Sequence, residues 1–450
     1  MGQNVTIAGA SYPDVPALDV PKTGGGTARF VDTADDTVTP ATLKSGVTAH
    51  DASGAKITGT LDTTPPKESD INFWDYDGTL LYAWTFAELA TKTELPPLPS
   101  HDGLVCQGWN WTLQDIKDAG RELDIGALYI TDDGKTRLYV DVDTETWDDF
   151  VLNYWQSAKN AVTVNWGDGS AEEVGPTSGW VTLRHVYGSS GAYMITLAIS
   201  GGATIIFTHP ISEGDDYISR ARIGMLTKVE LGANVKISYF AFGFAARMQT
   251  FTAPIGTVFD GSRIFEQCTA LRAFIAPSVL PANQTFLNSA AIRVVSTVKD
   301  NVMGNSFFNT AITRLNCDIT VANQAQALER VHIKAVNGKV GNFSSCRALL
   351  EVTIPADATT FIAAAFSGDN ALRRVTCLGD IASIPAQVFQ RCYPLRFVDF
   401  THCTAVPTLA NVNAFDQTHP QLEIRVPASL VSAWKAATNW SSLADHIVGV

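Results

Sequence analysis

The stretch ALRRVTCLGDIASIPAQVFQRC at residues 371–392 decides the fold, because related versions of it recur along the second half of the chain. Two of them are ALLEVTIPADATTFIAAAFSGD at 348–369 and ALRAFIAPSVLPANQTFLNSA at 270–290. In each, an apolar residue is followed by a second three positions later and a third two positions after that, the frame L-x-x-V-x-I. An Ala or Phe anchor comes next, often followed by Cys, Ser or Asn.

The frame runs through nine copies, with a period that is mostly 20 to 23 residues and one short copy after Ile312. A period in this range predicts a solenoid. The last two frame positions alternate, so they place two side chains on one face of a short strand, which only stacked neighbours can bury. The first positions of the copies are Leu226, Met248, Leu271, Ile292, Ile312, Leu328, Leu349, Leu372 and Leu395. The downstream aromatics expected on the opposite wall of the core are Phe242, Phe265, Phe286, Phe307, Phe343, Phe366, Phe389 and Phe415.

This pattern resembles the BspA-like leucine-rich repeats, whose consensus runs roughly L-x-x-V-x-I-P followed by A-F-x-x-C. The match is specific at 349–354, 366, 372–377 and 389–392, and looser at 246–320. The resemblance implies a solenoid that is used for binding at surfaces and carries no chemistry of its own.

Composition excludes several classes of function. The net charge of −13 and the pI of about 5.0 argue against a nucleic-acid partner, which would need clustered Lys and Arg. The chain lacks a run of about 18 apolar residues, so no insertion into a membrane is expected. It begins without a signal-peptide pattern, which predicts synthesis and retention in a cytoplasm. The seven Cys form no CxxC pair and are expected to be small buried hydrophobes, with no metal or other cofactor.

Residues 1–63 differ from the rest, being rich in Gly, Thr and Asp and nearly free of aromatics. Their last part resembles a small module of phage tail-fibre and baseplate proteins, carried here by Gly46, Gly54, Gly59 and Thr60. The resemblance implies a segment that attaches to other virion proteins.

A small α+β module is expected over 68–141. INFWDYDGTLLYAW predicts a hairpin at Asp77-Gly78, and ALYITDDGKTRLYVDV predicts a second hairpin at Asp133-Gly134. Short helices are expected between them, one ending before Pro96 and one at Gly120. The arrangement resembles leader regions in uncharacterised proteins of phages of Gram-positive bacteria.

Residues 142–208 contain VTVNWGDGS at 162–170 and HVYGSSGAYMITLAISGG from 185. These resemble the polycystic-kidney-disease (PKD)-like β-sandwich, and two alternating hairpin halves favour a sandwich independently. A crossover near 209–216 would lead to a solenoid over 217–420, and a cap over 421–450 would contain a helix from Pro427. The expected fold is therefore mainly β and multidomain. The residues that match the sandwich family are Trp166, Gly167, Asp168, Gly169, His185, Tyr187, Gly191 and Tyr193.

Catalysis is not expected. Paired carboxylates occur, for example Asp75 with Asp77 and Asp132 with Asp133, but in turn-like contexts where Asp is favoured for its backbone hydrogen bonds. The WGDGSAEE stretch lacks the alternating oxygen ligands of a calcium loop, and no nucleophile elbow occurs.

Two sets of residues are candidates for binding. The first is the outward row of the repeat strands, two and four positions after each frame start, which forms a ladder where solenoids usually bind. The second is Trp109 and Trp111 in GWNW, which strand alternation would place on one face, for stacking on sugar rings, although Trp in a small domain is also core material. The ladder candidates are Arg314, Asn316, Arg330, His332, Glu351, Arg374, Phe397 and Asp399.

The order of these resemblances predicts a phage virion structural protein, a tail-fibre or baseplate receptor-binding protein made in the host cytoplasm. Its partners would be other virion proteins at the N-terminal segment and a host cell-surface glycan or protein at the repeats, with a homotrimer left open. Three alternatives remain: a capsid fibre or decoration protein, a bacterial BspA-like surface adhesin, and a cell-wall glycan hydrolase.

Overall fold

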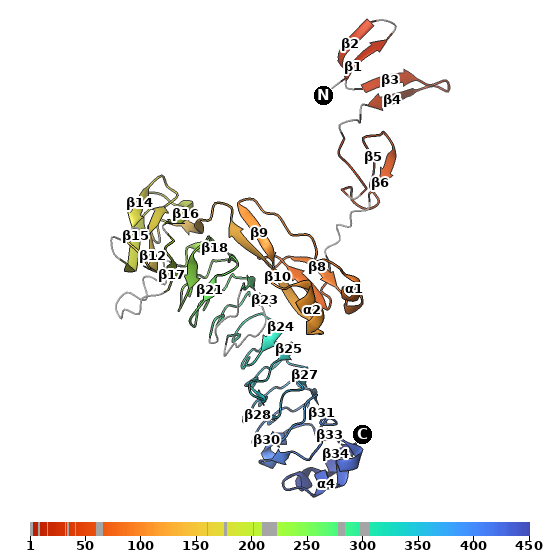
Figure 1. The fold of residues 1–450 in the computed structure, drawn as a ribbon, viewed down its shortest axis with the longest axis vertical. Coiled ribbons are helices and arrows are strands. Elements are labelled where there is room, and N and C mark those ends of the chain that lie inside the picture. The colour runs from red at the N-terminus through yellow and green to blue at the C-terminus, as the bar shows by residue number, and fades with distance from the viewer. Residues whose placement is uncertain are drawn as a thin grey trace. The chain divides into compact units, whose positions relative to one another are not determined.

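A computed structural model describes residues 3–450 except 8–9, 16, 32, 34–35, 41, 60–65, 160, 175–177, 201, 209–222, 278–283 and 298–305. The chain divides into two compact units, Met1–Pro66 and Lys67–Val450. Figure 1 shows the second unit as a small module and a sandwich that both adjoin a solenoid.

The first unit consists of three separate antiparallel pairs of strands. Apart from Gly59, every residue of this unit whose burial is described is half-buried or exposed. The described side chains of this unit therefore form little shared core, and the pairs hold together through backbone hydrogen bonds and turns. They are β1 (Gln3–Ile7) with β2 (Ala10–Val15), β3 (Ala17–Pro21) with β4 (Thr27–Val31), and β5 (Thr48–His50) with β6 (Lys56–Thr58).

The second unit begins with a module whose four strands lie in the order β8-β7-β10-β9. Thr85 and Glu88 form a reciprocal capping box that starts the first helix, and Gly120, with a φ of 59°, ends the second. The ring of Phe73 packs edge-on against Trp84 at 4.7 Å. The elements are β7 (Ile71–Trp74), β8 (Leu80–Trp84), α1 (Phe86–Thr91), β9 (Leu104–Trp109), α2 (Leu113–Ala119) and β10 (Leu123–Thr131).

The predicted first hairpin, β7 with β8, is confirmed, but the hairpin expected at Asp133-Gly134 is wrong. Strand β10 pairs with β7 and β9, whereas β11 (Thr136–Val142) pairs with β16 (Gly191–Ile199) and β18 (Leu226–Glu230). The inward residues of β11, such as Leu138 and Val140, are buried in the core of the sandwich, and a pairing with β10 would leave them outside it. The Asp133-Gly134 turn thus passes the chain from one domain to the next, ahead of the boundary expected at 141.

The sandwich has two sheets, in the orders β14-β13-β16-β11-β18-β20 and β15-β12-β17-β19-β21. Its buried Trp166 stacks on His185, and the Tyr187 hydroxyl donates to the Trp166 carbonyl at 3.0 Å. Asp168 accepts from Ser170 and lies 2.7 Å from His185, and these contacts lower the pKa of Asp168 to about 2. Its further strands are β12 (Asp149–Gln156), β13 (Val162–Asn165), β14 (Ala171–Val174), β15 (Gly179–Val186), β16 (Gly191–Ile199) and β17 (Ile205–Phe207).

Both sheets of the sandwich continue into the solenoid. Strand β18 (Leu226–Glu230) pairs antiparallel with β11, and β20 (Thr250–Thr252) pairs parallel with β18. In the other sheet, β19 (Val235–Ile237) and β21 (Val258–Phe259) follow β17 in parallel. The sandwich therefore covers the N-terminal end of the repeat stack, which would otherwise expose unpaired strand edges. The crossover expected near 209–216 and the solenoid start at 217 lie outside the described residues.

The solenoid confirms the predicted mainly-β repeat architecture. The L-x-x-V-x-I strands line up in parallel in several hydrogen-bonded groups, which we together call the outer sheet, and shorter strands form a second sheet that the frame did not predict. The outer strands after β20 are β22 (Ala273–Ile275), β23 (Val294–Ser296), β24 (Arg314–Ile319), β25 (Arg330–Ile333), β27 (Glu351–Ile354), β29 (Arg374–Cys377), β31 (Phe397–Asp399) and β33 (Glu423–Val426). The short strands are β26 (Lys339–Val340), β28 (Thr360–Phe361), β30 (Ser383–Ile384) and β32 (Thr408–Leu409).

The anchor phenylalanines form stacked columns inside the solenoid. Phe265 lies 5.8 Å from Phe286, and Phe366 lies 5.8 Å from Phe389, with nearly parallel rings. Three residues after Phe265, Phe286, Phe343 and Phe389, a small polar side chain donates to a carbonyl of the preceding repeat; these side chains are Cys268, Ser289, Cys346 and Cys392. The Cys392 thiol, for example, donates to the Phe366 carbonyl at 3.1 Å, and burial raises the pKa of that thiol. The expected role as small buried residues is confirmed for five cysteines, whereas Cys106 is half-buried and Cys317 lies outside the described side chains; the five are Cys268, Cys346, Cys377, Cys392 and Cys403.

The predicted C-terminal helix is confirmed as α4 (Val431–Ala436), which lies between two 3-10 segments, η2 (Ala428–Leu430) and η3 (Trp440–His446). Trp434 and Trp440 are fully buried with ring centroids 4.6 Å apart. Strand β34 (Ile447–Gly449) then adds to β33, so the last open edge of the outer sheet is extended by the cap itself.

Candidate binding face of the repeat solenoid

The outward side chains of the outer sheet form the candidate site. In β27 the alternation is strict, with Val352 and Ile354 buried and Glu351 and Thr353 exposed. The register then aligns Glu351 with Arg374, and Arg374 with Phe397, in successive strands. The ladder expected from the frame is therefore a real row of neighbouring side chains.

The first half of this ladder is covered by the α+β module, which packs on β22 and β23. Trp74 and Leu128 of the module form one apolar cluster with Ala273, Ile275 and Val294. The approach is close at Gly126, where a Cβ would lie 2.2 Å from Ile275 Cγ2. Only glycine fits at this point of contact.

Arg314 and Asn316, expected to be on an exposed face, lie under the module instead. The Arg314 guanidinium is 2.7 Å from Glu68 and 3.3 Å from Asp124, and the side chain is only 11% exposed. Burial raises the pKa of Asp124, while the Arg314 charge and the Trp74 indole N–H, which donates at 2.8 Å, act to lower it. The frame could not reveal this burial, because the covering residues come from a distant part of the sequence.

Trp109 and Trp111 are also buried, which removes the platform for sugar stacking that their spacing suggested. Trp109 is the last residue of β9, packs edge-on against Phe73 and donates from its indole nitrogen to the Pro96 carbonyl at 3.0 Å. Trp111 lies beyond the strand and donates to the Thr297 carbonyl of the solenoid at 2.8 Å. Trp109 therefore belongs to the core of the module, and Trp111 to the contact between the module and the solenoid.

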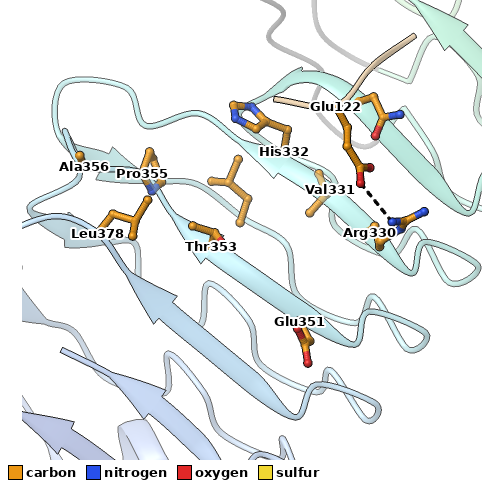
Figure 2. A pocket seen from close by; sticks show the side chains of 11 residues that line it. Glu122, Arg330, Val331, His332, Glu351, Thr353, Pro355, Ala356 and Leu378 are labelled. Atoms are coloured by element: carbon orange, nitrogen blue, oxygen red, sulfur yellow. Dashed lines mark hydrogen bonds and ion pairs between the residues drawn. The ribbon is translucent and has the colours of Figure 1, made fainter. Parts of the chain in front are cut away.

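Where the module ends, a pocket of about 400 Å³ opens on the outer sheet, which we call the step pocket. Figure 2 shows Glu122 of the module pointing at Arg330 across its edge, with an ion pair of 3.3 Å. Both partners are substantially exposed, so the ion pair contributes little to stability. The pocket is lined by Glu122, Asn316, Arg330, Val331, His332, Ile333, Glu351, Thr353, Pro355, Ala356 and Leu378.

Beyond the step pocket the ladder is open, and Phe397 is at the centre of a guanidinium cluster. Arg374 lies 4.7 Å, Arg425 5.0 Å and Arg396 5.7 Å from its ring centroid. Three cations on one half-exposed ring form an amphipathic surface with an apolar centre.

The acidic ladder residues are partly engaged. Glu351 lies 3.9 Å from Arg374, and Asp399 accepts from the backbone and hydroxyl of Thr401 in its own turn. Of the residues expected on the face, the structure thus brings Arg330, His332 and Glu351 together in the step pocket and Arg374 and Phe397 in the cluster.

Several members of the face were missed by the sequence reasoning. Pro355 and Leu378 each come directly after the third frame position, so they were not among the predicted outward residues. Leu378 is 42% exposed. An apolar residue at this place in the repeat was the signal that could have revealed both. Glu122 carried no such signal, because it lies 208 residues before its partner Arg330.

Within the described residues, no group of three or more His, Cys, Asp or Glu side chains is placed to hold a metal ion. Among the same residues, none of the helices has the length and apolar character needed to cross a bilayer.

The fold and this face define a leucine-rich-repeat solenoid. Comparison with family models identifies the type: residues 223–329 and 324–436 match the BspA type leucine rich repeat region. No curated protein matches the chain. Among solved structures, one match is a leucine rich cell surface protein from Faecalibacterium prausnitzii A2-165, with 14% identity and a TM-score of 0.25, covering 50% of this chain and 81% of that one.

Proposed function

We propose that this protein is a surface-recognition protein, a BspA-like adhesin that binds a partner at a bacterial cell surface. Binding would use the open part of the outer sheet, from the step pocket to the cluster around Phe397. The observation that carries the proposal is this continuous open face beside a covered one, with Arg330, Arg374 and Phe397 available on it.

The chemistry of the face supports a macromolecular or glycan partner. Arg and aromatic side chains are enriched at the centres of binding interfaces. The step pocket of about 400 Å³ is also large enough for a sugar ring or an apolar side chain, and the exposed Leu378 provides an apolar wall. The ligand would be a cell-surface glycan or protein.

The proposal includes no catalysis. Asp75 accepts from the Tyr129 hydroxyl at 2.6 Å and lies 2.7 Å from His101. Asp132 and Asp133 both contact Arg137. These two carboxylate pairs are used in turns and ion pairs, so neither supports a glycan hydrolase. Incubation with purified wall glycans tests this point, since released reducing ends would contradict a binding-only role.

A second candidate is a phage receptor-binding protein on a tail fibre, baseplate or capsid, with the same binding face. Residues 1–66 support it, because strand pairs whose described side chains are almost all half-buried or exposed are expected of a segment that gains its core from a partner. The sequence resemblance of 1–63 to phage modules and of 142–208 to PKD-like spacers points the same way. Fibres are often homotrimers, and sedimentation of the full chain tests whether this chain forms one.

The binding role is tested with the full chain on bacterial cells. The double variant Arg374→Glu/Phe397→Ala is expected to lower cell binding at least tenfold, since hot-spot side chains each contribute about 2 kcal/mol or more. Lys339→Glu is the matched control, because Lys339 is an exposed cation on the second sheet of the same solenoid. Equal binding by the two variants would exclude the open face as the contact surface.

The location of the protein, on bacterial cells or on virions, distinguishes the two candidate functions. Antibodies against the full chain should label intact bacterial cells if it is an adhesin. Mass spectrometry of purified virions should contain it if it is a virion protein, and a chain lacking 1–66 should then fail to be incorporated.

A further inference from the structure

Arg272 and Arg293 form a pair of neighbouring cations at the start of β22 and β23. Each is the second residue of its frame copy, and the Arg293 backbone N–H donates to the Arg272 carbonyl at 2.9 Å. Neighbouring parallel strands are about 4.8 Å apart, so the two side chains leave the backbone side by side. Both are exposed, and neither forms an ion pair with any residue that the structure describes.

The β7–β8 turn of the module forms a wall beside this pair. A Cβ on Gly78 would lie 3.5 Å from the Ala273 Cβ and 3.8 Å from the Arg272 Cβ, so the turn touches the solenoid here. Two adjoining cavities of about 500 Å³ and about 430 Å³ open along the contact. They share four lining residues, Gly78, Arg293, Val294 and Ala311, and we call them together the junction groove.

The charges in the junction groove are unevenly compensated. At one end, Arg314 is paired with Glu68 at 2.7 Å and with Asp124 at 3.3 Å. At the other end, Asp77 is the acidic residue of the lining, and its carboxylate accepts from the Thr79 backbone N–H at 2.8 Å. Arg272 and Arg293 thus leave local positive charge in a chain whose net charge is −13.

We propose that the junction groove binds an anionic polysaccharide through one of its oxyanion groups, held between Arg272 and Arg293. Guanidinium groups recognise carboxylate, sulfate and phosphate oxygens with paired hydrogen bonds. Each cavity is within the roughly 300–1,000 Å³ range of small-molecule sites, so the groove accommodates a sugar ring as well as its anion. Thr79 and Thr313, which also line it, offer hydroxyls to the ring. This site is separate from the open face and does not depend on the proposed function.

The test titrates the full chain, at low salt to limit screening, with dextran sulfate, polygalacturonate and neutral dextran, and with free sulfate, phosphate and acetate. Either anionic polymer is expected to bind more tightly than its free anion, and neutral dextran is expected not to bind. Arg272→Gln/Arg293→Gln is expected to weaken polymer binding about tenfold or more. Asp77→Asn, which removes the opposing charge from the groove, is expected to strengthen it.

Arg347→Gln/Arg391→Gln is the matched control, since it removes the same charge from two exposed arginines of the same solenoid. Neither arginine lines the junction groove or the step pocket, and neither belongs to the cluster around Phe397. The control is expected to bind the polymer as the unchanged chain does. An equal loss of polymer affinity in both double variants, or no loss in Arg272→Gln/Arg293→Gln, overturns the proposed site. Binding no tighter than the free anion, or binding of neutral dextran, overturns the ligand class. If the groove pair fails to fold, an unchanged affinity of Asp77→Asn overturns the proposal.

Discussion

The outer sheet of the solenoid has two halves that share one repeat frame and differ in what lies on their outward side chains. On β22 and β23 the outward residues Ala273 and Val294 are small or medium-sized, buried, and covered by the α+β module. On β29 and β31 the residues at the same frame position are Arg374 and Phe397, which stay half-exposed and contact each other. The inward residues are equally buried in both halves.

This difference shows that the frame controls only the core of a repeat. Because inward and outward positions alternate along a strand, the outward residues are free to become an internal domain contact in one half and an open face in the other. The three predictions that follow each compare one half with the other, from the largest expected effect to the smallest.

Removing a ring from the stacked column should cost the same in both halves. Phe286→Ala and Phe366→Ala are each expected to lower the free energy of unfolding by about 4 kcal/mol, since each leaves a cavity in a fully buried column. Equilibrium urea unfolding, with hydrogen exchange of the neighbouring repeats, measures the loss. Phe397→Ala, on the open face, is the control and should cost about 1 kcal/mol or less. A much smaller loss in one half would mean that the two halves do not share one core.

Removing an outward arginine is expected to destabilise the protein more in the covered half than in the open half. Arg314→Ala is expected to cost about 3 kcal/mol, because it leaves the buried Asp124 carboxylate without its cation. Arg374→Ala removes an exposed ion pair and should cost less than about 1 kcal/mol. Urea unfolding of both variants gives the comparison, and Arg314→Met/Asp124→Asn should recover part of the loss. Similar costs for the two Ala variants would argue that the module does not cover β24.

The residue three positions after each Phe gives a pH-dependent comparison. In the covered half Ser289 donates to the Phe265 carbonyl at 2.6 Å, whereas the open half has Asp369 at the equivalent place. Burial raises the pKa of Asp369 well above its usual range, and its Oδ2 has no hydrogen-bond partner among the described residues. Because the folded-state pKa lies above the unfolded one, the contribution of Asp369 to stability is present at acidic pH and lost as the pH rises through the folded value.

Asp369→Cys is therefore expected to stabilise the protein by about 1–2 kcal/mol near neutral pH, with a gain that shrinks on acidification. Ser289→Cys is the matched change and should alter stability little at any pH, since a thiol donates to the same kind of carbonyl at Cys392. Urea unfolding at several pH values distinguishes the two. A gain for Asp369→Cys that is independent of pH would contradict a protonated carboxyl group in the fold.

Much of the fold could be predicted because its causes are local. The frame around Leu372 and the anchor Phe389 specify a strand and a buried ring in each repeat, and the apolar spacing after Pro427 specifies the cap helix. The second hairpin failed because Asp133-Gly134 satisfies the rules of a tight turn equally well when its two flanking strands join different sheets. Turn chemistry sets the reversal of the chain, while the partners of each strand depend on where its apolar face can be buried.

The candidate face was predicted only in part, for the same reason. Arg330, His332, Glu351, Arg374 and Phe397 are on it, and Asn316, although buried, lines the step pocket, while Arg314, Trp109 and Trp111 are not on the face. Ala273 and Val294 are apolar although they point outward, which indicates that another part of the chain covers the first half of the sheet. The sequence could not show which segment covers it, because the contacts between the module and the solenoid join residues more than 160 positions apart.

By itself the sequence determined that this chain stacks BspA-type repeats and which side chains point into their core, since that information repeats with a fixed period. Only the tertiary structure decided which outward side chains are free to bind. The sequence of the α+β module does not contain the repeat. The module packs over β22 to β24, and Glu122 lies at the edge of this contact, where the step pocket opens. The β7–β8 turn of the module forms a wall of the junction groove. Burial of an outward residue depends on a partner surface from elsewhere in the chain, and a repeat cannot encode that partner.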